Sequence, residues 1–203
     1  MSQDTYKYER VPYLVVYEDK SAFKDTYAGE IDRVALTCQL LKPKGRPSKT
    51  VVIWSHPIGG GSYLPMMAAL AKAGVHTIYC DTRYRGVDTA LIMEKVACDL
   101  GAVVRDAKER LGYDKVVLGG WSGGGSMALF YQAEAENPTV TSTPAGDPPD
   151  LTTRGFVPAD AMMLVAAHHA RHVTFTEWID PSVIDENDPE NRVVDLDLYD
   201  KNN

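Results

Sequence analysis

One serine, Ser122, stands among glycines in residues 120–124, which read GWSGG. The apolar run 115–119 before it predicts a buried strand, and residues 125–131 after it predict a helix. A G-x-S-x-G pattern at such a junction is typical of a nucleophile elbow, a tight turn that holds the serine hydroxyl at the end of the strand, beneath the first turn of the helix. We therefore predict that Ser122 is a nucleophile; the alternative is a serine that only caps the helix.

A glycine-rich loop at residues 55–62, which reads SHPIGGGS, follows an earlier apolar run. Acyl transfer needs N–H donors aimed at the oxygen that becomes negatively charged. The residue after the nucleophile usually supplies one donor, here Gly123, and the loop after the third strand supplies the other. We expect the second donor to be Ile58 or Gly59. The alternative interpretation is a turn whose glycines were selected only for their backbone angles.

The base that should activate the serine is harder to find. A serine hydroxyl is a weak nucleophile until a base accepts its proton, and that base needs an orienting group. His56 lies in a loop position that is usually structural, and His76 opens a strand at the wrong end of the sheet. His168 and His169 follow a strand at the active edge and, with His172, are candidate bases or pocket-lining residues. A metal site at these three is disfavoured, because adjacent residues in a strand point to opposite faces.

Strand and helix patterns alternate along the chain. This alternation predicts an α/β fold with a mostly parallel sheet, helices on both faces and a site at the carboxyl ends of the strands. The loops that should meet there are residues 55–63, residues 81–89 and the elbow. The expected strands are 13–17, 31–41, 51–54, 75–80, 116–119 and 161–167, and the expected helices are 65–73, 88–111 and 123–136.

On these motifs the chain resembles the α/β-hydrolase superfamily, and within it the bacterial esterase-like serine hydrolases. The resemblance covers Val51–Tyr131, and more loosely about Ile31–Ala167; it is carried by HPIGGG at 56–61, DTRYRG at 81–86 and the elbow. It implies that Ser122 is the nucleophile, that backbone N–H groups form an oxyanion hole, and that an acid and a histidine come from later strands. One departure is Pro57, which replaces the usual glycine after the loop histidine and has no N–H to donate.

The strand at 161–167 is the sixth that the sequence predicts, and no further β-α-β pattern follows it. We therefore expect the chain to be the N-terminal part of the fold, without its last strands, and the catalytic histidine and acid to lie on polypeptide absent from this chain. An apolar edge strand also exposes unpaired backbone groups. Both points predict a second polypeptide that completes the sheet and the triad. The acidic residues 168–203 would be a lid, a dock for that polypeptide or a solvated terminus.

The length fits one domain, which the resemblance identifies as an α/β-hydrolase-type domain with a core at about 31–167, a possible cap or connection at 137–160 and the acidic tail. The chain has 203 residues and a net charge of −7, which argues against nucleic-acid binding because phosphates need a basic surface. No apolar stretch has the length of a membrane span, and the N-terminus lacks the apolar region of a secretory signal. Three cysteines without C-x-x-C spacing predict reduced thiols in a cytoplasmic protein.

The leading hypothesis is hydrolysis of a carboxylic ester, or less favourably a thioester or amide, through an acyl-Ser122 intermediate and without a cofactor. The substrate would be a small acyl compound. Trp121, His56 and Arg83 are candidate pocket residues. Arg83 or Arg85 would bind a substrate carboxylate, or else pair with an acidic neighbour such as residue 81 or 88. The alternative function is a non-catalytic binding or assembly subunit with half of the hydrolase fold. Nucleotide binding is disfavoured, because the glycines match neither phosphate-binding fingerprint.

Overall fold

The computed structural model describes residues 5–19, 33–59, 65–86, 91–170, 173–174, 181–185 and 187–202. The chain divides into two compact units, residues 1–167 and 168–203, which are described separately. The boundary between them falls where the expected core gives way to the acidic tail. None of the helices in the described ranges is long and apolar enough to cross a membrane.

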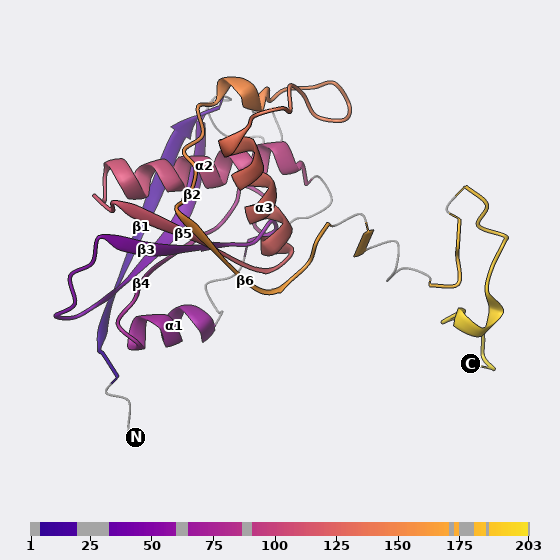
Figure 1. The fold of residues 1–203 in the computed structure, drawn as a ribbon, viewed down its shortest axis with the longest axis horizontal. Coiled ribbons are helices and arrows are strands. Elements are labelled where there is room, and N and C mark those ends of the chain that lie inside the picture. Colours follow the sequence, from indigo (N-terminus) through magenta and orange to yellow (C-terminus); the bar gives the residue numbers. More distant parts are fainter. Residues whose placement is uncertain are drawn as a thin grey trace. The chain divides into compact units, whose positions relative to one another are not determined.

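The first unit is built on a six-stranded sheet in the order β1-β2-β4-β3-β5-β6 (Figure 1). β2 runs antiparallel to β1 and β4, and the other neighbouring strands are parallel. The predicted α/β fold with a mostly parallel sheet is therefore confirmed. The strands are β1 (Tyr8–Glu18), β2 (Arg33–Pro43), β3 (Thr50–Ser55), β4 (His76–Cys80), β5 (Lys115–Ser122) and β6 (Ala161–Ala167).

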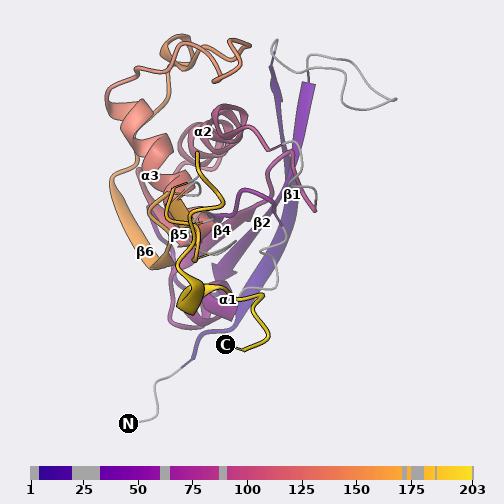
Figure 2. The same ribbon diagram turned by 90° about the vertical axis from the view of Figure 1, so that its right-hand side faces the viewer.

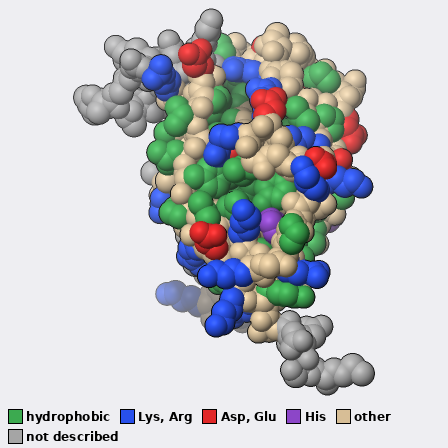
Figure 3. Space-filling model, turned by 90° about the vertical axis from the view of Figure 1, so that its left-hand side faces the viewer, with side chains coloured by type: hydrophobic (Ala, Val, Ile, Leu, Met, Phe, Trp, Pro, Cys, Tyr) green, Lys and Arg blue, Asp and Glu red, His purple; other side chains and the backbone are tan. Residues whose placement is uncertain are grey.

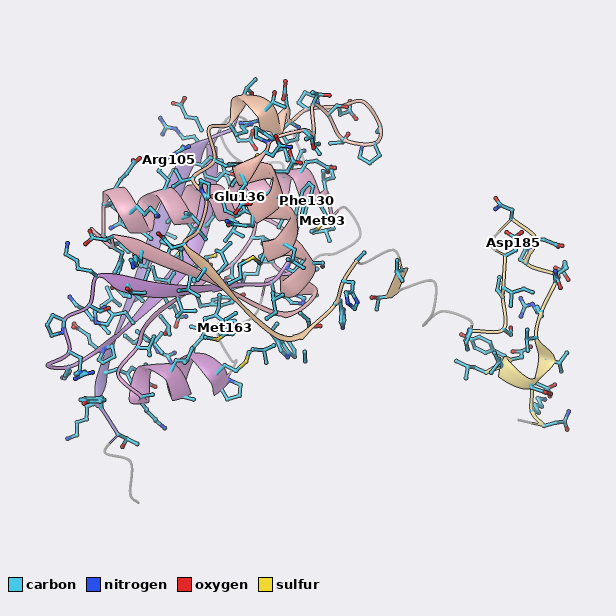
Figure 4. All side chains as sticks on the ribbon, viewed as in Figure 1. Met93, Arg105, Phe130, Glu136, Met163 and Asp185 are labelled. Carbon is cyan, nitrogen blue, oxygen red and sulfur yellow. The ribbon has the colours of Figure 1, made fainter. Side chains whose placement is uncertain are left out.

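Helices cover both faces of this sheet. α1 (Pro65–Lys72) lies on one face, and α2 (Met93–Glu109) and α3 (Gly123–Glu136) lie on the other (Figures 1 and 2). Met93 at the start of α2 and Phe130 on α3 both pack against the larger core (Figure 4).

The alternation of side chains along β3 divides the core in two. Val51 and Ile53 pack in the cluster that contains the inner faces of α2 and α3. Val52 and Trp54 point the other way and pack with side chains of α1. Successive strand residues face opposite sides of a sheet, so this short apolar run is buried on both faces. It holds the loop that follows β3 in a fixed place.

Most elements form close to their predicted ends, and α3 and β6 have the predicted bounds. The largest differences are at the starts of β1 and α2. β1 begins at Tyr8 rather than at residue 13. α2 begins at Met93 rather than at residue 88 because Ile92 has an extended backbone; residues 87–90 lie outside the described residues. β5 is longer than predicted and runs through Ser122, which directly precedes the first residue of α3. The serine therefore sits on the strand-to-helix junction itself.

The connection between α3 and β6 is ordered and tied to α3. The Glu134 carboxylate accepts the N–H groups of Thr139 and Val140 at 2.9 and 3.0 Å. The Tyr131 hydroxyl donates to the Val157 carbonyl at 2.7 Å. These bonds fasten both ends of the connection to the helix that begins at Gly123, directly after Ser122. Two short 3-10 helices are Leu151–Thr153, in this connection, and Val194–Leu196, in the second unit.

The second unit contains little regular structure in its described residues. Val183 and Arg192 form an isolated antiparallel bridge. Large apolar side chains are exposed there between acidic ones: Ile184, Val194, Leu196, Leu198 and Tyr199. Asp185 lies in the same unit (Figure 4). The roles of lid, dock and solvated terminus stay predictions for this segment.

Candidate active site

Ser122 has backbone angles that few residues other than glycine adopt. Its φ is 53° and its ψ is −128°, and such strained conformations cluster at functional sites. The side chain makes no capping hydrogen bond to α3; instead the Ser126 hydroxyl donates to the Gly123 carbonyl at 3.0 Å. The structure contradicts the capping alternative, and it leaves the half-buried Ser122 hydroxyl unengaged by the helix that it precedes.

The elbow packs closely against the end of β3 and the end of β6. A β-carbon at Gly124 would lie 2.4 Å from the Ser55 carbonyl oxygen, and one at Gly120 would lie 2.6 Å from the Gly125 α-carbon. A β-carbon at Gly125 would lie 2.3 Å from that of Ala167, at the end of β6. Larger residues at these positions would push apart the elements around Ser122, which explains the run of glycines.

The two expected loop donors differ in their hydrogen bonds. The Gly59 N–H already donates to the His56 carbonyl at 2.9 Å, and Gly59 is buried. Ile58 is half-buried, and its N–H has no hydrogen-bond partner within the part of the chain that the structure describes. Gly123 is the first residue of α3, so its N–H is among those that lack an acceptor inside the helix. Ile58 and Gly123 thus present open donors, and Gly59 does not.

His56 and Trp121 lie beside the elbow. The His56 Nε2 atom would be 3.3 Å from a β-carbon at Gly123, and the His56 ring centroid is 6.0 Å from a Trp121 ring centroid. Both residues are half-buried. No hydrogen bond joins either side chain to the Ser122 hydroxyl in the described residues. Both residues therefore lie next to the turn that carries Ser122.

Arg83 is held in a buried cluster of charges. Its Nη2 atom lies 2.9 Å from Asp99 Oδ1 and 2.8 Å from Asp19 Oδ2. The Tyr17 hydroxyl accepts from Arg83 and donates to Asp99, each at 2.6 Å. Burial, and then the nearby Asp99 carboxylate, raises the pKa of Tyr17 above its ordinary range, so this hydroxyl stays protonated. Arg154 pairs with Asp19 from the other side at 3.2 Å.

Arg85 is paired as well, but near the surface. Its Nη1 atom lies 3.2 Å from Asp81 Oδ2, which is one of the acidic partners that the sequence suggested as the alternative to substrate binding. The Arg85 side chain is 62% exposed. Its α-, β- and γ-carbons lie next to Gly59, about where a β-carbon on that glycine would point. Arg85 therefore packs against the loop that carries Ile58.

The first unit contains one other histidine, and the remaining three belong to the second unit. His76, at the start of β4, is buried with Nδ1 2.7 Å from the Tyr113 hydroxyl and Nε2 2.7 Å from the Arg46 carbonyl. Burial raises the pKa of Tyr113 to about 12, so its hydroxyl stays protonated at neutral pH. Both ring nitrogens of His76 therefore have structural partners. His168 is half-buried and His169 is exposed in the second unit. His172 lies outside the described residues.

The three cysteines offer no competing nucleophile. Cys38, Cys80 and Cys98 are free and buried. Burial raises the pKa of Cys80 and of Cys98 to about 12, and it also raises the pKa of Cys38 above its ordinary range. The thiolate is the reactive form of cysteine, so these thiols are inert at neutral pH.

A cavity of about 450 Å³ lies elsewhere, between β1, α2 and residues 153–156, and contains none of the predicted site residues. Its arginines are already bound: Arg110 pairs with Asp106, and Arg105 donates to the carbonyls of Arg154 and Gly155. Lys and Arg side chains also surround apolar ones on the face drawn in Figure 3. The cavity does not extend the predicted site, because none of its lining residues belongs to that site.

The strand order, the strained serine between β5 and α3, and the loop that packs against it agree with one another. This α/β arrangement agrees with the fold that the resemblance to the α/β-hydrolases implied. No protein-family model and no curated protein matches the sequence.

Solved structures with a similar fold include esterases, a lipase and a hydrolase. Among them are bacterial heroin esterase (18% identity, TM-score 0.49) and a putative hydrolase from Agrobacterium vitis (16%, 0.46); the matches cover 77% and 90% of this chain and 45% and 59% of those chains. Brefeldin A esterase, a bacterial homologue of human hormone-sensitive lipase, is 19% identical with a TM-score of 0.45, over 67% of this chain and 37% of that one. The chain spans only 37% to 59% of the length of these three structures. These likenesses concern the fold, and the function is inferred from the site itself.

Two residues that support the loop were not identified from the sequence. The Thr82 hydroxyl donates to the Pro57 carbonyl at 2.5 Å, and the Gly86 N–H donates to the Ile58 carbonyl at 2.8 Å. A threonine after a strand gives no signal of such a contact, because its partner lies 25 residues earlier in the chain. The sequence predicted only that the loop after β4 lies at the same edge of the sheet as the loop after β3.

Proposed function

We propose that this chain carries the nucleophile of a serine hydrolase that cleaves carboxylic esters, and less readily thioesters or amides, of small acyl compounds. The observation that carries the proposal is the strained backbone of Ser122 at the junction of β5 and α3, with a hydroxyl that does not cap the helix. This geometry is expected of a nucleophile and serves no purpose in a helix cap. The esterases among the structural neighbours are consistent with it.

In the proposed reaction Ser122 Oγ attacks the ester carbonyl carbon while a base accepts the hydroxyl proton. The carbonyl oxygen becomes an oxyanion that accepts hydrogen bonds from the N–H groups of Gly123 and Ile58. The tetrahedral intermediate then expels the alcohol, which takes the proton from the base, and leaves an acyl-Ser122 ester. Water attacks this ester in the same way, releases the carboxylic acid and restores the serine. No cofactor is required.

The proposal includes a second polypeptide that brings the catalytic histidine and acid. Its support is that Ser122 Oγ has no hydrogen-bond partner among the described residues, so no base is in place there. β6 pairs only with β5 in the described sheet, and Met163 and Leu164 on it are 36% and 47% exposed (Figure 4). Such an apolar edge is a template for another strand. A strand added to β6 would lie on the side of Ser122 that is away from β3.

Hydrolysis of a short-chain aryl ester such as p-nitrophenyl acetate tests the activity in natively purified material. Ser122→Ala should abolish the hydrolysis above background, whereas the matched control Ser126→Ala should keep most of it, because Ser126 only bonds the Gly123 carbonyl. Equal loss in both variants, or activity that survives Ser122→Ala, would contradict the assignment.

Size-exclusion chromatography with identification of co-eluting chains tests the second polypeptide. The proposal expects a second chain in the active fraction and little activity from the 22.3 kDa chain expressed alone. Full activity of a lone monomer would refute the need for a partner. A stable complex in which Ser122 remains inert would instead support the alternative function, a non-catalytic assembly subunit.

A further inference from the structure

Three hydrogen bonds fix the peptide groups of residues 56–59: two come from the segment after β4 and one lies within the loop. The Pro57 carbonyl accepts from the Thr82 hydroxyl, and the Ile58 carbonyl accepts from the Gly86 N–H. The Gly59 N–H is consumed inside the loop by the His56 carbonyl. Since Pro57 has no N–H, Ile58 carries the one N–H among residues 57–59 that stays open in the described structure.

The Pro57 carbonyl and the Ile58 N–H belong to the same peptide group. This group is planar and trans, so its C=O and N–H bonds point in opposite directions. A hydrogen bond that fixes the carbonyl on one side therefore fixes the direction of the N–H on the other side. We propose that Thr82 is a positioning residue for the oxyanion hole: its hydroxyl holds the Pro57–Ile58 peptide so that the Ile58 N–H faces the substrate oxygen.

The surroundings of Thr82 suit this role. The residue is 4% exposed, and its oxygen accepts the Tyr84 N–H at 3.2 Å, so its single proton is directed to the Pro57 carbonyl. Threonine is branched at the β-carbon and has a stiff side chain. The strands that precede the two loops are also locked together, because the Ser55 hydroxyl donates to the Cys80 carbonyl at 3.0 Å.

This inference rests on the proposed function, since an oxyanion hole matters only if Ser122 reacts. Loss of one oxyanion donor typically lowers kcat by about 10²–10³-fold, and a misdirected donor should cost about tenfold to a hundredfold. Thr82→Val should therefore lower kcat and the rate of Ser122 phosphonylation by that factor, with little change in KM. Thr82→Ser, which keeps the hydroxyl, should recover most of the rate.

Thr37→Val is the matched control. Thr37 also donates from a threonine hydroxyl to the segment after β4, but to Asp81 Oδ2 at 2.6 Å rather than to the loop after β3. Its loss should leave kcat within about twofold of the wild-type value, because the change touches neither donor of the oxyanion hole. If kcat fell equally in Thr37→Val and Thr82→Val, Thr82 would only support the segment after β4 in a general way. This result would overturn the inference.

Crystal structures of the wild type, Thr82→Val and Thr82→Ser separate this inference from the proposed function. The Pro57–Ile58 peptide should turn in the valine variant and keep its direction in the serine variant. An unchanged peptide in Thr82→Val overturns the inference whether or not Ser122 reacts, and so does a turned peptide with an undiminished reaction rate. If wild-type Ser122 takes up no phosphonate, the proposed function fails, while the peptide direction still decides what Thr82 does. Thr82→Ala replaces the valine variant should the latter not fold.

Discussion

The polar groups around Arg83 and those around Ser122 both follow strands of one sheet, but the first set is closed by hydrogen bonds and the second is open. Arg83 and Asp99 satisfy each other and share the Tyr17 hydroxyl, in a place where the Asp99 side chain is 2% exposed. The Ser122 hydroxyl and the Ile58 N–H, by contrast, have no partner in the described residues.

The region around Arg83 therefore contributes mainly to the stability of the fold, and the region around Ser122 mainly to its reactivity. Buried charges are tolerated only when they are paired and hydrogen-bonded, and the Arg83 cluster meets this condition while it joins residues of β1, α2 and the loop after β4. Open donors beside a strained serine cost stability in the free protein, and they gain partners only when a substrate oxygen arrives. A substitution should therefore affect folding in one region and chemistry in the other.

The largest expected effect is on stability, from Asp99→Ala. The change leaves Arg83 partly unpaired in a buried site, and breaking a buried ion pair in this way costs about 3–5 kcal/mol. The urea midpoint of unfolding should fall accordingly. The fraction that remains folded should react with a serine probe at nearly the wild-type rate. A loss of stability below about 1 kcal/mol would show that the cluster is not the support described above.

Gly124→Ala should affect both stability and reactivity. Its new β-carbon would meet the Ser55 carbonyl oxygen at 2.4 Å, and such overpacking costs about 1–3 kcal/mol. Because the loop after β3 has to move, the probe reaction at Ser122 should slow by about tenfold or more.

Gly101→Ala is the control for this change. Its β-carbon would meet the Phe156 ring, a side chain that can turn aside, at 2.7 Å. Thermal unfolding and probe kinetics of the two variants, measured side by side, check the difference. If Gly101→Ala lost as much reactivity as Gly124→Ala, the close contact between Gly124 and the Ser55 carbonyl would have no specific role in the reaction.

Glu134→Gln should give a smaller, pH-dependent loss of stability. Burial alone would raise the pKa of Glu134, but hydrogen bonds from the Val140 and Thr139 N–H groups and from the Thr139 hydroxyl outweigh it and lower the pKa below the ordinary 4.5. A depressed carboxyl pKa stabilises the fold above the ordinary pKa, and this stabilisation is lost as the pH falls through the folded pKa.

Near pH 7 the variant should be less stable than the wild type by about 1 kcal/mol, a usual net value for a hydrogen bond. The difference should shrink as the pH falls below 4.5, as urea unfolding at several pH values would show. A difference that grows toward acidic pH would contradict the sign of the shift.

The smallest effect is expected from Arg85→Ala. The Arg85 end of its ion pair with Asp81 is exposed, and such pairs contribute about 0–1 kcal/mol. The buried Asp81 carboxylate keeps the Thr37 hydroxyl as a donor when Arg85 is removed. Chemical unfolding should hardly distinguish the variant from the wild type, and added salt should reduce any difference. If Arg85→Ala lost as much stability as Asp99→Ala, the ion pairs of Arg83 and Arg85 would not differ in their contribution to stability, contrary to this account.

Local patterns predicted the parts of the site that depend on neighbouring residues. The apolar run before Ser122 and the glycines after it predicted the junction of strand and helix, and α3 and β6 have the predicted bounds. Contacts between distant segments could not be read in this way. The partners of Arg83 come from β1 and α2, and periodicity does not show which loop a side chain meets.

The choice between Ile58 and Gly59 shows the same limit. Both residues lie in one glycine-rich loop, and the sequence offers no reason to prefer either N–H. The preference follows from the turn in which the Gly59 N–H bonds the His56 carbonyl, and from the bonds that Thr82 and Gly86 make to the loop. These hydrogen bonds depend on the path of the backbone in three dimensions, whereas sequence patterns mainly indicate where side chains are buried or exposed.

Intact-mass spectrometry of natively purified protein, before and after treatment with a fluorophosphonate, tests the central claim most directly. If Ser122 is an activated nucleophile, the wild-type chain gains the mass of one adduct, and the Ser122→Ala variant gains none. A wild-type chain that stays unmodified together with all of its co-purifying partners, or an adduct that persists in Ser122→Ala, would contradict the assignment of Ser122 as the catalytic serine.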